Sequence, residues 1–418
     1  MKVLFVHQNF PGQYRHLAAA LLRRGDEVSA IASHTAPGLE GVRLHRYSLS
    51  DSIYRVSDSH PWSRDFEVKC IRGEKVLQLL SQIIQEGYQP DIVIGHPGWG
   101  ELLAIKDVLP STPVLHQVEF FYQTTGADAG FDPEFYQEEL QARTLIRMKR
   151  APQLLALHDL DWGLTPTQWQ ASTVPQIYRE KLSIIHEGID TSAAKPQGNA
   201  QVSLANAGLT FRPGDEVITF VARNLEPYRG FHIFMRMLPI LQALRPGVHA
   251  VIVGRDGVSY GALPKGGQSW KAALLKELDG CLDLSRIHFV GAVPNSVLHN
   301  LFGVTACHVY LTYPFVLSWS MLEAMACGAL LIGSSTPPVA EVIAHQRNGL
   351  LVDFFDIDKL AMQIADVLAA PRDYQPLREM ARLTVLERFD LRNVCLPRQI
   401  SLVDQLANGE TPDARLSS

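Results

Sequence analysis

The stretch VITFVARNLEPYRGFHIFMRMLPIL, residues 217–241, holds a strand, a loop and most of a helix in succession. Residues 217–223 form a short apolar run rich in β-branched residues, which is typical of a buried strand. From Phe231 to Leu244 apolar residues recur at helical spacing, and Gly230 marks the turn into the helix. A strand joined by a short loop to a helix is the unit from which parallel sheets are built.

The same unit recurs along both halves of the chain. In the second half the predicted strands are residues 217–223, 249–254, 287–291, 307–312, 329–333 and 349–352, with helices such as 231–244 and 319–327. In the first half they are residues 3–7, 27–32, 42–47, 91–95, 113–117, 163–165 and 183–186, with helices at 13–24, 68–85 and 134–157. This alternation predicts a parallel sheet in each half, covered by helices on both faces.

A chain of 418 residues is too long for one hydrophobic core, so we predict two doubly wound, Rossmann-like α/β domains. The first domain is expected at residues 1–190 and the second at 209–385. The segment 191–208 is rich in small residues and lacks periodicity, and we interpret it as a linker. Residues 386–407 are expected to form a C-terminal helix that either crosses back to the first domain or caps one sheet, and residues 408–418 a flexible tail.

The composition excludes several classes of protein. Hydrophobic residues make up 46% of the chain and charged residues 19%, which is the balance of a packed globular protein. The formal net charge of -5 argues against a nucleic-acid partner. No apolar run reaches the ~20 residues that span a bilayer, and the chain opens on a strand and not on a signal peptide. We expect a cytoplasmic protein, with peripheral contact at the inner face of the membrane left open.

Five cysteines are present: Cys70, Cys281, Cys307, Cys327 and Cys395. They are odd in number, far apart and without a C-x-x-C pair, which argues against a disulfide framework and against a zinc site. We interpret them as small buried apolar residues in a reducing compartment.

In open parallel sheets, ligands bind beyond the carboxyl ends of the strands. The first such loop is His7–Gln13, where Gly12 lets the backbone approach a ligand closely and the next helix offers its free N–H groups. Gly12 is therefore a candidate for ligand binding. The alternative is that Pro11 and Gly12 form only a turn.

Two arginines flank the loop after residues 217–223. Arg223 stands at the end of the strand and Arg229, six residues later, at the start of the helix. They can converge on a diphosphate from two sides, and the helix dipole adds to the positive field. The alternative is that both pair with carboxylates such as Glu226 on the surface.

Glu323 lies in an apolar helix in which Met321, Leu322 and Met325 are expected to be buried. A carboxylate in that setting needs a hydrogen-bonding partner, and the diol of a ribose is a suitable one. The alternative is a salt bridge within the core. Together with the two arginines, Glu323 predicts a site for a nucleoside diphosphate.

These segments resemble the retaining glycosyltransferases of family 4, which have the GT-B fold, with two Rossmann-like domains facing a central cleft. The resemblance rests on the stretches R-N-L-E-P-Y-R-G at residues 223–230 and E-A-M-A-C-G at residues 323–328. In that family an Arg and a Lys hold the donor diphosphate, and the Glu binds the donor ribose. The resemblance thus assigns the diphosphate to Arg223 and to Arg229, which replaces the usual Lys, and the ribose to Glu323.

The resemblance extends over nearly the whole chain. Lys2–Val6 resembles the opening strand, Ile184–Asp190 the segment that usually reads I-P-N-G-V-D, and Asn348–Val352 the N-G-x-L-V strand. Val290–Pro294 resembles the loop that contacts the base, which makes Val293 a candidate for base binding.

One position departs from the pattern of the family. The family usually has a second Glu, eight residues before the ribose-binding one, in an E-G-F-G turn where it contacts the donor sugar. Here Phe315 occupies that position, and the turn reads F-V-L-S. We expect the sugar to be recognised instead by backbone N–H groups from Leu317 to Trp319, or by the hydroxyls of Ser318 and Ser320.

The resemblance implies that the chain moves a hexose from a nucleoside-diphosphate sugar to a glycan, lipid or small-molecule acceptor, with retention of anomeric configuration. The nucleotide sugar is then a co-substrate, and no separate cofactor is expected. Arg223 and Arg229 can stabilise the departing diphosphate without a metal, and no D-x-D cluster follows a predicted strand. We therefore assign no metal ligand and no protein nucleophile.

His116 is the third candidate catalytic residue, because the family often has a His close to the donor sugar after a strand of the first domain. The alternative is a structural, hydrogen-bonded histidine. His96 and Glu119 are further candidates of the same kind. The segments Glu119–Tyr122 and Phe131–Glu139 are candidates for the acceptor site, because the first domain usually holds the acceptor in this family.

Two questions stay open at this point. The stretch that carries Arg143, Arg147, Lys149 and Arg150 is either a solvated helix face or an interfacial membrane helix for a lipid-linked acceptor. Phe315 also leaves two alternatives to a transferase, namely a nucleotide-sugar-binding regulatory pseudoenzyme and a nucleotide-sugar epimerase.

Overall fold

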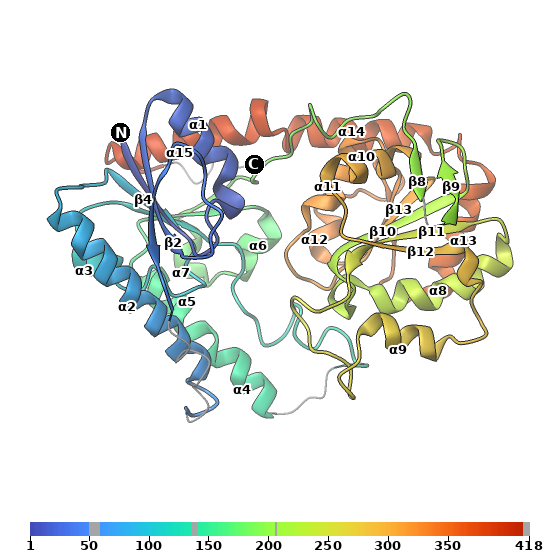
Figure 1. Ribbon diagram of the computed structural model, residues 1–418, viewed down its shortest axis with the longest axis horizontal. Coiled ribbons are helices and arrows are strands. Elements are labelled where there is room, and N and C mark those ends of the chain that lie inside the picture. Colours follow the sequence, from blue (N-terminus) through green and yellow to red (C-terminus); the bar gives the residue numbers. More distant parts are fainter. Residues whose placement is uncertain (50–58, 136–139, 205–206, 413–418) are drawn as a thin grey trace. The chain divides into compact units, whose positions relative to one another are not determined.

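The computed structural model describes residues 1–49, 59–135, 140–204 and 207–412, which form two compact units (Figure 1). Unit 1 comprises Met1–Gly188 and the C-terminal segment that begins at Arg392, and unit 2 is Ile189–Leu391. Parts of three predicted segments lie outside the described residues: 136–139 of the loop and helix, 205–206 of the linker, and 413–418 of the tail.

Unit 1 is built on a seven-stranded sheet with the order β3-β2-β1-β4-β5-β6-β7, in which every neighbouring pair is parallel. Its strands are β1 (Lys2–Val6), β2 (Glu27–Ser33), β3 (Arg43–Tyr47), β4 (Ile92–Gly95), β5 (Val114–Gln117), β6 (Trp162–Thr165) and β7 (Leu182–Ile184). The winding direction reverses between β1 and β4, which is where sheets of this kind bind ligands.

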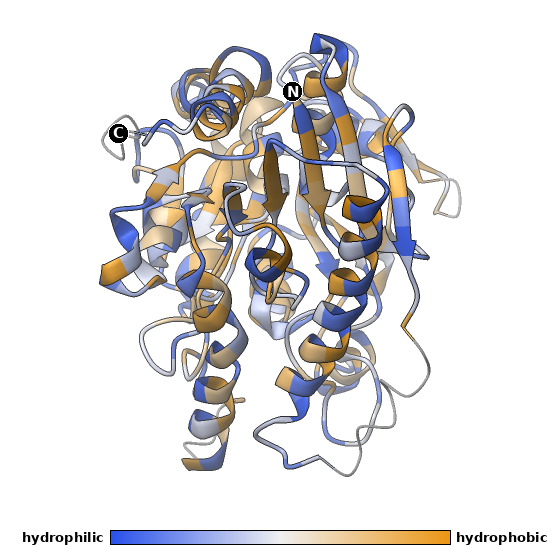
Figure 2. Cartoon of the chain, turned by 90° about the vertical axis from the view of Figure 1, so that its left-hand side faces the viewer, coloured by the Kyte–Doolittle hydropathy of each residue, from blue (hydrophilic) through white to orange (hydrophobic). Residues whose placement is uncertain are grey.

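Helices cover both faces of this sheet. They are α1 (Arg15–Arg24), α2 (Arg64–Gln85), α3 (Ile105–Val108), α4 (Leu140–Met148), α5 (Arg150–His158), α6 (Gln168–Thr173), α7 (Gln176–Arg179) and α15 (Leu396–Ala407). Along β1, Val3 and Phe5 pack with α1 and α15, whereas Leu4 and Val6 pack with α2, because successive side chains of a strand point to opposite faces. Figure 2 accordingly shows largely apolar strands between helices that have one apolar and one polar face.

The C-terminal helix α15 belongs to unit 1, which corresponds to the first of the two expected alternatives, a return of the chain to its first half. It lies beside α1, as the red and blue helices in Figure 1 show. Leu402 and Val403 are buried in the same core as β1, and the Arg24 guanidinium binds the Asp404 carboxylate at 2.7 Å.

Unit 2 is built on a six-stranded parallel sheet with the order β12-β11-β10-β13-β14-β15. Its strands are β10 (Val217–Asn224), β11 (His249–Arg255), β12 (Ile287–Gly291), β13 (Cys307–Tyr310), β14 (Leu331–Ser334) and β15 (Leu350–Val352). The switch point lies between β10 and β13. An antiparallel pair, β8 (Val202–Leu204) and β9 (Leu209–Phe211), adjoins the unit's core, so the described part of the predicted linker contains a strand.

The helices of unit 2 are α8 (Phe231–Leu244), α9 (Trp270–Glu277), α10 (Asn295–Val304), α11 (Trp319–Ala326), α12 (Pro337–Ala340), α13 (Ile357–Ala369) and α14 (Gln375–Arg388). The predicted helix at 231–244 has the same bounds as α8, and each predicted strand overlaps an observed one. The prediction of two doubly wound α/β domains is confirmed.

Two predicted helices are interrupted. The described part of the helix expected at 134–157 consists of α4 and α5, which break at Lys149 because Pro152 lacks an N–H group and its ring crowds the carbonyl four residues earlier. The helix expected at 386–407 begins only at Leu396, after α14 has ended at Arg388, and Pro397 stands in its first turn, where the missing N–H does no harm.

The prediction that the cysteines are buried holds for three of them. Cys307, Cys327 and Cys395 are buried, and burial raises the pKa of the Cys307 thiol to about 12. Cys70 and Cys281 are exposed, so for these two the prediction was wrong. Both lie on polar outer surfaces, α2 and the turn after α9, where a small side chain needs no apolar surroundings.

We predict that Gly230→Ala destabilises unit 2 by about 2–4 kcal/mol, measured as the free energy of unfolding in urea. Gly230 has φ 69°, which disfavours a side chain, and a Cβ there would also collide with the Leu311 side chain. Gly280→Ala is the matched control, because Gly280 has φ 73° and its Cβ would meet no atom within 4 Å. Equal losses in the two variants would contradict the packing argument.

Candidate functional site

The carboxyl ends of β10 and β13 meet at the switch point of unit 2. After β10 the chain forms a 3-10 turn (Pro227–Arg229) and enters α8 through Gly230. After β13 a loop leads to Ser318, whose side chain caps the start of α11. The arginines, serines and glutamate predicted to bind the donor therefore lie on elements that border this point.

Arg229 is the centre of this site. Its side chain is 7% exposed. Its Nη1 donates to the Thr312 hydroxyl at 2.9 Å, the Val316 carbonyl at 2.9 Å and the Tyr310 hydroxyl at 3.3 Å. Its guanidinium carbon lies 5.4 Å from the centre of the Tyr260 ring. Within the described residues neither Nε nor Nη2 has a hydrogen-bond partner, and no carboxylate pairs with the charge. The buried cation is thus oriented by neutral groups and keeps donors for an anion.

Glu226 does not neutralise either arginine in the described chain. Its carboxylate accepts the backbone N–H groups of Ser259 at 2.9 Å, Tyr260 at 3.2 Å and Gly261 at 2.8 Å. This carboxylate fixes the loop after β11, which carries Tyr260 over Arg229. The expected alternative, ion pairs of both arginines with Glu226, is not what the structure shows.

Arg223 lies at the end of β10 with an exposed side chain. No hydrogen bond or ion pair of this guanidinium occurs among the residues described. It is therefore a solvent-exposed cation at the same sheet edge as Arg229, available for a ligand phosphate.

Glu323 lies on α11 with a side chain that is 19% exposed. Its Oε1 is 4.0 Å from Nε2 of the buried His299, a distance too long for a hydrogen bond. No closer partner occurs in the described part of the chain. A half-buried carboxylate with unused acceptor positions suits the two hydroxyls of a ribose.

Phe315 lies in an aromatic cluster, defined as Tyr228, Tyr260, Tyr313 and Phe315. Its ring meets Tyr228 and Tyr260 edge to face, with centroid distances of 5.6 Å and 5.0 Å. Because Tyr260 also covers Arg229, the wall beside the candidate diphosphate site is apolar where the family usually has an acidic side chain.

The remaining predicted donor-site residues are partly engaged with the protein itself. The Ser318 N–H donates to the Tyr310 hydroxyl at 2.8 Å, and the Ser318 and Ser320 hydroxyls are 2.9 Å apart. Trp319 and Val293 are partly buried against the core of unit 2. If Val293 contacts a base, only part of its side chain is accessible to it.

Three histidines follow strands of unit 1 and share one local geometry. Nδ1 of His7, His96 and His186 accepts the backbone N–H two residues later, at 3.2, 2.9 and 3.0 Å respectively. This bond assigns the proton to Nε2 in the neutral ring. Burial lowers the pKa of His7 to about 3 and that of His186 to about 4, so both are neutral hydrogen-bond donors near pH 7.

Two glutamates, Glu119 and Glu187, lie near the Nε2 atoms of His96 and His186. Nε2 of His96 is 3.4 Å from Oε2 of Glu119, and Nε2 of His186 is 3.6 Å from Oε2 of Glu187. Sequence reasoning singled out His96 and Glu119 but missed His7 and His186 as side chains. The position after a strand was the signal that could have identified these side chains. His7 and His96 directly follow β1 and β4, and His186 follows β7 after one further residue. In each case the backbone N–H two residues later binds Nδ1.

Glu101 is a second residue that the sequence did not reveal. Its carboxyl group is 1% exposed and accepts the Tyr47 hydroxyl at 2.8 Å, while its Oε2 has no hydrogen-bond partner. Burial, partly offset by the Tyr47 hydrogen bond and by Arg72, raises the pKa of Glu101 to about 7. It follows β4, at the edge where His7 and His96 lie.

His116 lies within β5, inside the strand predicted at residues 113–117, and not in the loop that follows it. The side chain is 1% exposed, and burial lowers its pKa to about 3. The strand extends through Gln117 because residues 115–117 pair with β6. The ring is buried, but its Nδ1 has no hydrogen-bond partner among the described residues, so the structure does not show the hydrogen-bonded histidine of the structural interpretation. The predicted catalytic role of His116 stays a prediction.

Gly12 has φ 46° and lies against His7, where a Cβ would come within 3.0 Å of the imidazole Cε1. The glycine therefore permits the buried position of the His7 ring. Its predicted contact with a ligand stays a prediction.

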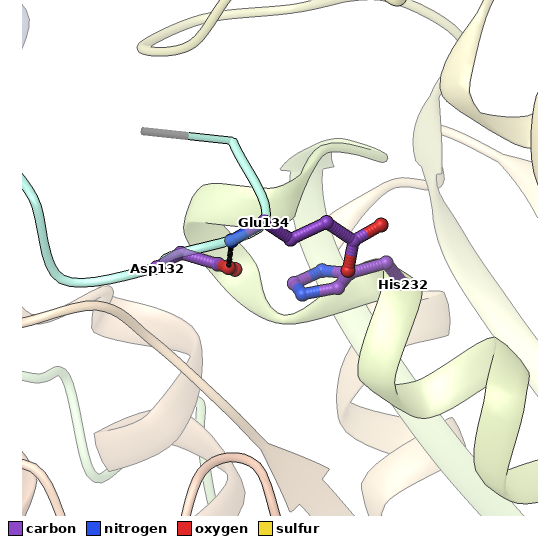
Figure 3. A group of neighbouring side chains, drawn as sticks. All are labelled: Asp132, Glu134 and His232. Carbon is purple, nitrogen blue, oxygen red and sulfur yellow. Dashed lines mark hydrogen bonds between the residues drawn. The ribbon is translucent and has the colours of Figure 1, made fainter. Parts of the chain in front are cut away.

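The predicted acceptor loop Phe131–Glu139 is described up to residue 135. Asp132 is buried, and its carboxylate accepts the Glu134 backbone N–H at 3.0 Å, the bond dashed in Figure 3. His232, also drawn there, belongs to α8 of unit 2, so the three residues do not form a group within either unit.

The basic stretch of α4 has no buried residue and carries Arg143 and Arg147. Its apolar side chains Leu140 and Leu145 are 79% and 39% exposed. None of the described helices combines the length and the apolar character needed to cross a bilayer. Contact of α4 with a membrane surface stays a prediction.

We predict that Glu101 makes the stability of the protein fall as pH rises from about 4.5 to about 7, by at most ~3 kcal/mol. Its folded pKa of about 7 lies above the ordinary value of 4.5, so the neutral form is the one that folding favours. Glu101→Gln should flatten this part of the profile of unfolding free energy against pH. The exposed Glu74→Gln is the control and should leave the slope unchanged; a slope that survives in Glu101→Gln would refute the assignment.

Comparison with known proteins covers both halves of the chain. Residues 24–194 match the glycosyl transferase family 4 group, and residues 206–384 match the glycosyl transferases group 1. A D-inositol 3-phosphate glycosyltransferase of Segniliparus rotundus is 26% identical over 58% of this chain and 51% of its own length. A GDP-mannose-dependent alpha-(1-6)-phosphatidylinositol monomannoside mannosyltransferase of Mycobacterium tuberculosis is 26% identical over 45% and 46%. The matched part thus spans about half the length of these curated relatives.

Solved structures share the fold over almost the whole chain. Alr3699/HepE of Anabaena, solved in complex with UDP, has a TM-score of 0.65 at 16% identity and covers 97% of this chain and 100% of its own. Sucrose-phosphate synthase of Thermosynechococcus elongatus has a TM-score of 0.70 at 18% identity, with 98% and 100% covered. Because the two family matches together span both α/β units and these structures have the same fold, the chain belongs to the family 4, group 1 glycosyltransferases with the GT-B fold.

Proposed function

We propose that the chain transfers a hexose from a nucleoside-diphosphate sugar to an acceptor with retention of configuration. The observation that carries the proposal is the buried Arg229, whose charge has no carboxylate beside it in the described chain. A diphosphate would supply the missing negative charge. Arg223 supports the same assignment from the strand end, and Glu323 on α11 supports binding of a ribose.

The chemistry required of the protein is stabilisation of the departing diphosphate. As the bond between the sugar and the phosphate oxygen breaks, negative charge grows on that departing oxygen. A fixed cation beside this oxygen, in a site from which water is excluded, lowers the barrier of the reaction. Arg229 is fixed by its three Nη1 bonds, so it needs little reorganisation. We propose that the two arginines do this without a metal, and that attack comes from the face the diphosphate leaves.

The acceptor side of the proposal is supported by unit 1. Neutral Nε2–H donors of His7 and His186, with the carboxylates of Glu119 and Glu187 nearby, offer both donors and acceptors to a hydroxyl-rich molecule. The relatives named above act on inositol phosphate or a phosphatidylinositol mannoside, and we propose a polyol or glycan acceptor of that general class. We also propose a cytoplasmic location, which the unpaired cysteines support.

We predict that Arg229→Gln lowers turnover of the donor by about 10²- to 10³-fold, because it removes a charge that acts on the leaving group. Glu323→Gln should instead raise the KM for the donor, by about 10- to 100-fold, through a lost charged hydrogen bond. Release of nucleoside diphosphate from UDP-, GDP- and ADP-sugars measures both effects, and the anomeric signals of the product in NMR report retention.

Arg236→Gln is the control for these variants. Arg236 lies on α8 with Arg229 close by in sequence, but it pairs with Glu277 at 2.5 Å on the outer surface. Its turnover should stay within about twofold of wild type, because exposed ion pairs contribute little. Wild-type turnover in Arg229→Gln, together with a wild-type KM for the donor in Glu323→Gln, would refute the proposed site.

A second candidate function, a regulatory protein that binds nucleotide sugars without transferring them, is favoured by Phe315. The aromatic cluster puts no carboxylate where one usually meets the donor sugar. Calorimetry separates the two candidates. Tight binding of a nucleoside-diphosphate sugar, with no loss of that donor across a broad acceptor panel, would favour the regulator, whereas release of nucleoside diphosphate favours the transferase.

A further inference from the structure

Unit 1 contains a cavity of about 390 Å³ between the loop after β5 and the helices α6 and α7. Its lining includes the guanidinium groups of Arg150 and Arg179, the hydroxyl groups of Thr125 and Ser172, and the ring of Trp169. None of the described residues that line it is acidic. The cavity lies wholly within unit 1 and is separate from the nucleotide site proposed for unit 2.

Both guanidinium groups are held in place by backbone carbonyls. Arg150 donates from Nε to the Tyr122 carbonyl at 2.7 Å, and Arg179 donates from Nε to the Val174 carbonyl at 2.7 Å and from Nη2 to the Ser172 carbonyl at 2.5 Å. Nη1 of each arginine has no hydrogen-bond partner in the described part of the chain. Two oriented cations thus face one cavity, each with a donor left over.

The charges of Arg150 and Arg179 are not compensated by an acidic side chain in the described part of the chain. Neither arginine forms an ion pair with a carboxylate among the described residues. Burial and the nearby Arg147 both lower the pKa of Arg150, which shows that its surroundings oppose the cation. Arg150 is partly buried and Arg179 is exposed, so two like charges face one cavity with no acidic residue in its lining, and an anion that both can bind would stabilise them.

The shape and chemistry of the lining select the kind of anion. Guanidinium groups match the oxygens of a phosphate, which can accept from two donors at once, and hydroxyl groups can satisfy the remaining oxygens. Trp169 stacks on Phe120 with a centroid distance of 6.0 Å and offers an apolar wall to the organic part of the ligand. The volume lies within the range of about 300–1,000 Å³ that small-molecule sites occupy.

We propose that this cavity binds the phosphate of a small phosphomonoester, with Arg150 and Arg179 as its charged ligands. The phosphomonoester is either a phosphorylated acceptor or a regulator that is not consumed. The interpretation of the ligand as a phosphorylated acceptor rests on the proposed transfer function. The proposal of a phosphate-binding site in this cavity does not depend on that function. Bound there, the phosphate would fix the loop after β5, which carries Gln123 and Thr125.

The test uses the full-length protein saturated with UDP or GDP, so that the nucleotide site cannot take up the probe. Glucose 6-phosphate and inositol 3-phosphate are titrated by calorimetry beside glucose and inositol. We expect each phosphate ester to bind at least about 10-fold more tightly than its unphosphorylated partner, because a bidentate charged contact is lost without the phosphate. If the wild-type protein binds each ester and its parent polyol with equal affinity, the proposal is overturned, and no variant is needed to show it.

Variants locate the site. Arg179→Gln and Arg150→Gln should each weaken binding of the esters by about 10- to 100-fold and leave binding of the parent polyols unchanged. Arg23→Gln, which removes an exposed charge of α1, is the control. Circular dichroism checks that each variant is folded, and Arg179→Lys, which keeps the charge, should retain part of the affinity. Ester affinity equal to wild type in the folded Arg179→Gln would also overturn the proposal.

A final experiment distinguishes an acceptor from a regulator as the bound ester. It also tests the phosphate site independently of the proposed transfer function. Incubation with donor and bound ester yields a glycosylated ester if the ligand is an acceptor, and unchanged ester if it is a regulator; either result requires the site. Failure of nucleotide sugars to bind would refute the proposed transferase but leave ester binding measurable in the absence of nucleotide.

Discussion

The site in unit 2 depends on a buried cation, Arg229, that has no carboxylate paired with it among the residues the structure describes. An ionised side chain removed from water is unstable unless hydrogen bonds or an opposite charge replace its hydration. The three oxygens bound to Nη1 of Arg229 and the ring of Tyr260 replace it only in part. The same bonds hold the carbonyl of Val316 and the hydroxyl of Tyr310, and that hydroxyl in turn receives the N–H of Ser318 at the start of α11. Arg229, which we propose as a diphosphate ligand, therefore also helps to position α11, the helix that carries Glu323.

Unit 1 uses the opposite electrostatic arrangement at its own switch point. Burial lowers the pKa of His7 and His186 and keeps both neutral, and the backbone N–H bound by Nδ1 determines which nitrogen carries the proton. Neutral donors beside carboxylates suit hydroxyl groups, whereas fixed cations suit phosphates. Under the proposed function, unit 2 would stabilise the charge of the departing diphosphate and unit 1 would bind an uncharged polyol face, with the arginine-lined cavity as the exception.

The strands, α8 and the doubly wound class could be predicted because apolar periodicity depends only on nearby residues. The positions of Arg229 and Glu323 beside the switch point of unit 2 could be predicted as well, since both follow from where strands end and helices start. The sequence could not show how polar groups pair across the fold. Glu226 binds three backbone N–H groups that lie more than thirty residues away in the chain, and Glu101 meets Tyr47 across two strands. Phe315 was recognised as a departure, but its aromatic partners, such as Tyr260, come from a different loop. The burial of His116 likewise depends on pairing of β5 with β6.

The central claim is that Arg229 binds the diphosphate of the donor. A crystal structure of the protein with the nucleoside diphosphate that stabilises it most would test this directly. The account predicts phosphate oxygens within about 3 Å of Nε or Nη2 of Arg229, with the Nη1 bonds intact, Arg223 turned toward the second phosphate, and a ribose hydroxyl bound to Glu323. A diphosphate bound elsewhere, with Arg229 still facing only Tyr260 and its three neutral oxygens, would contradict it.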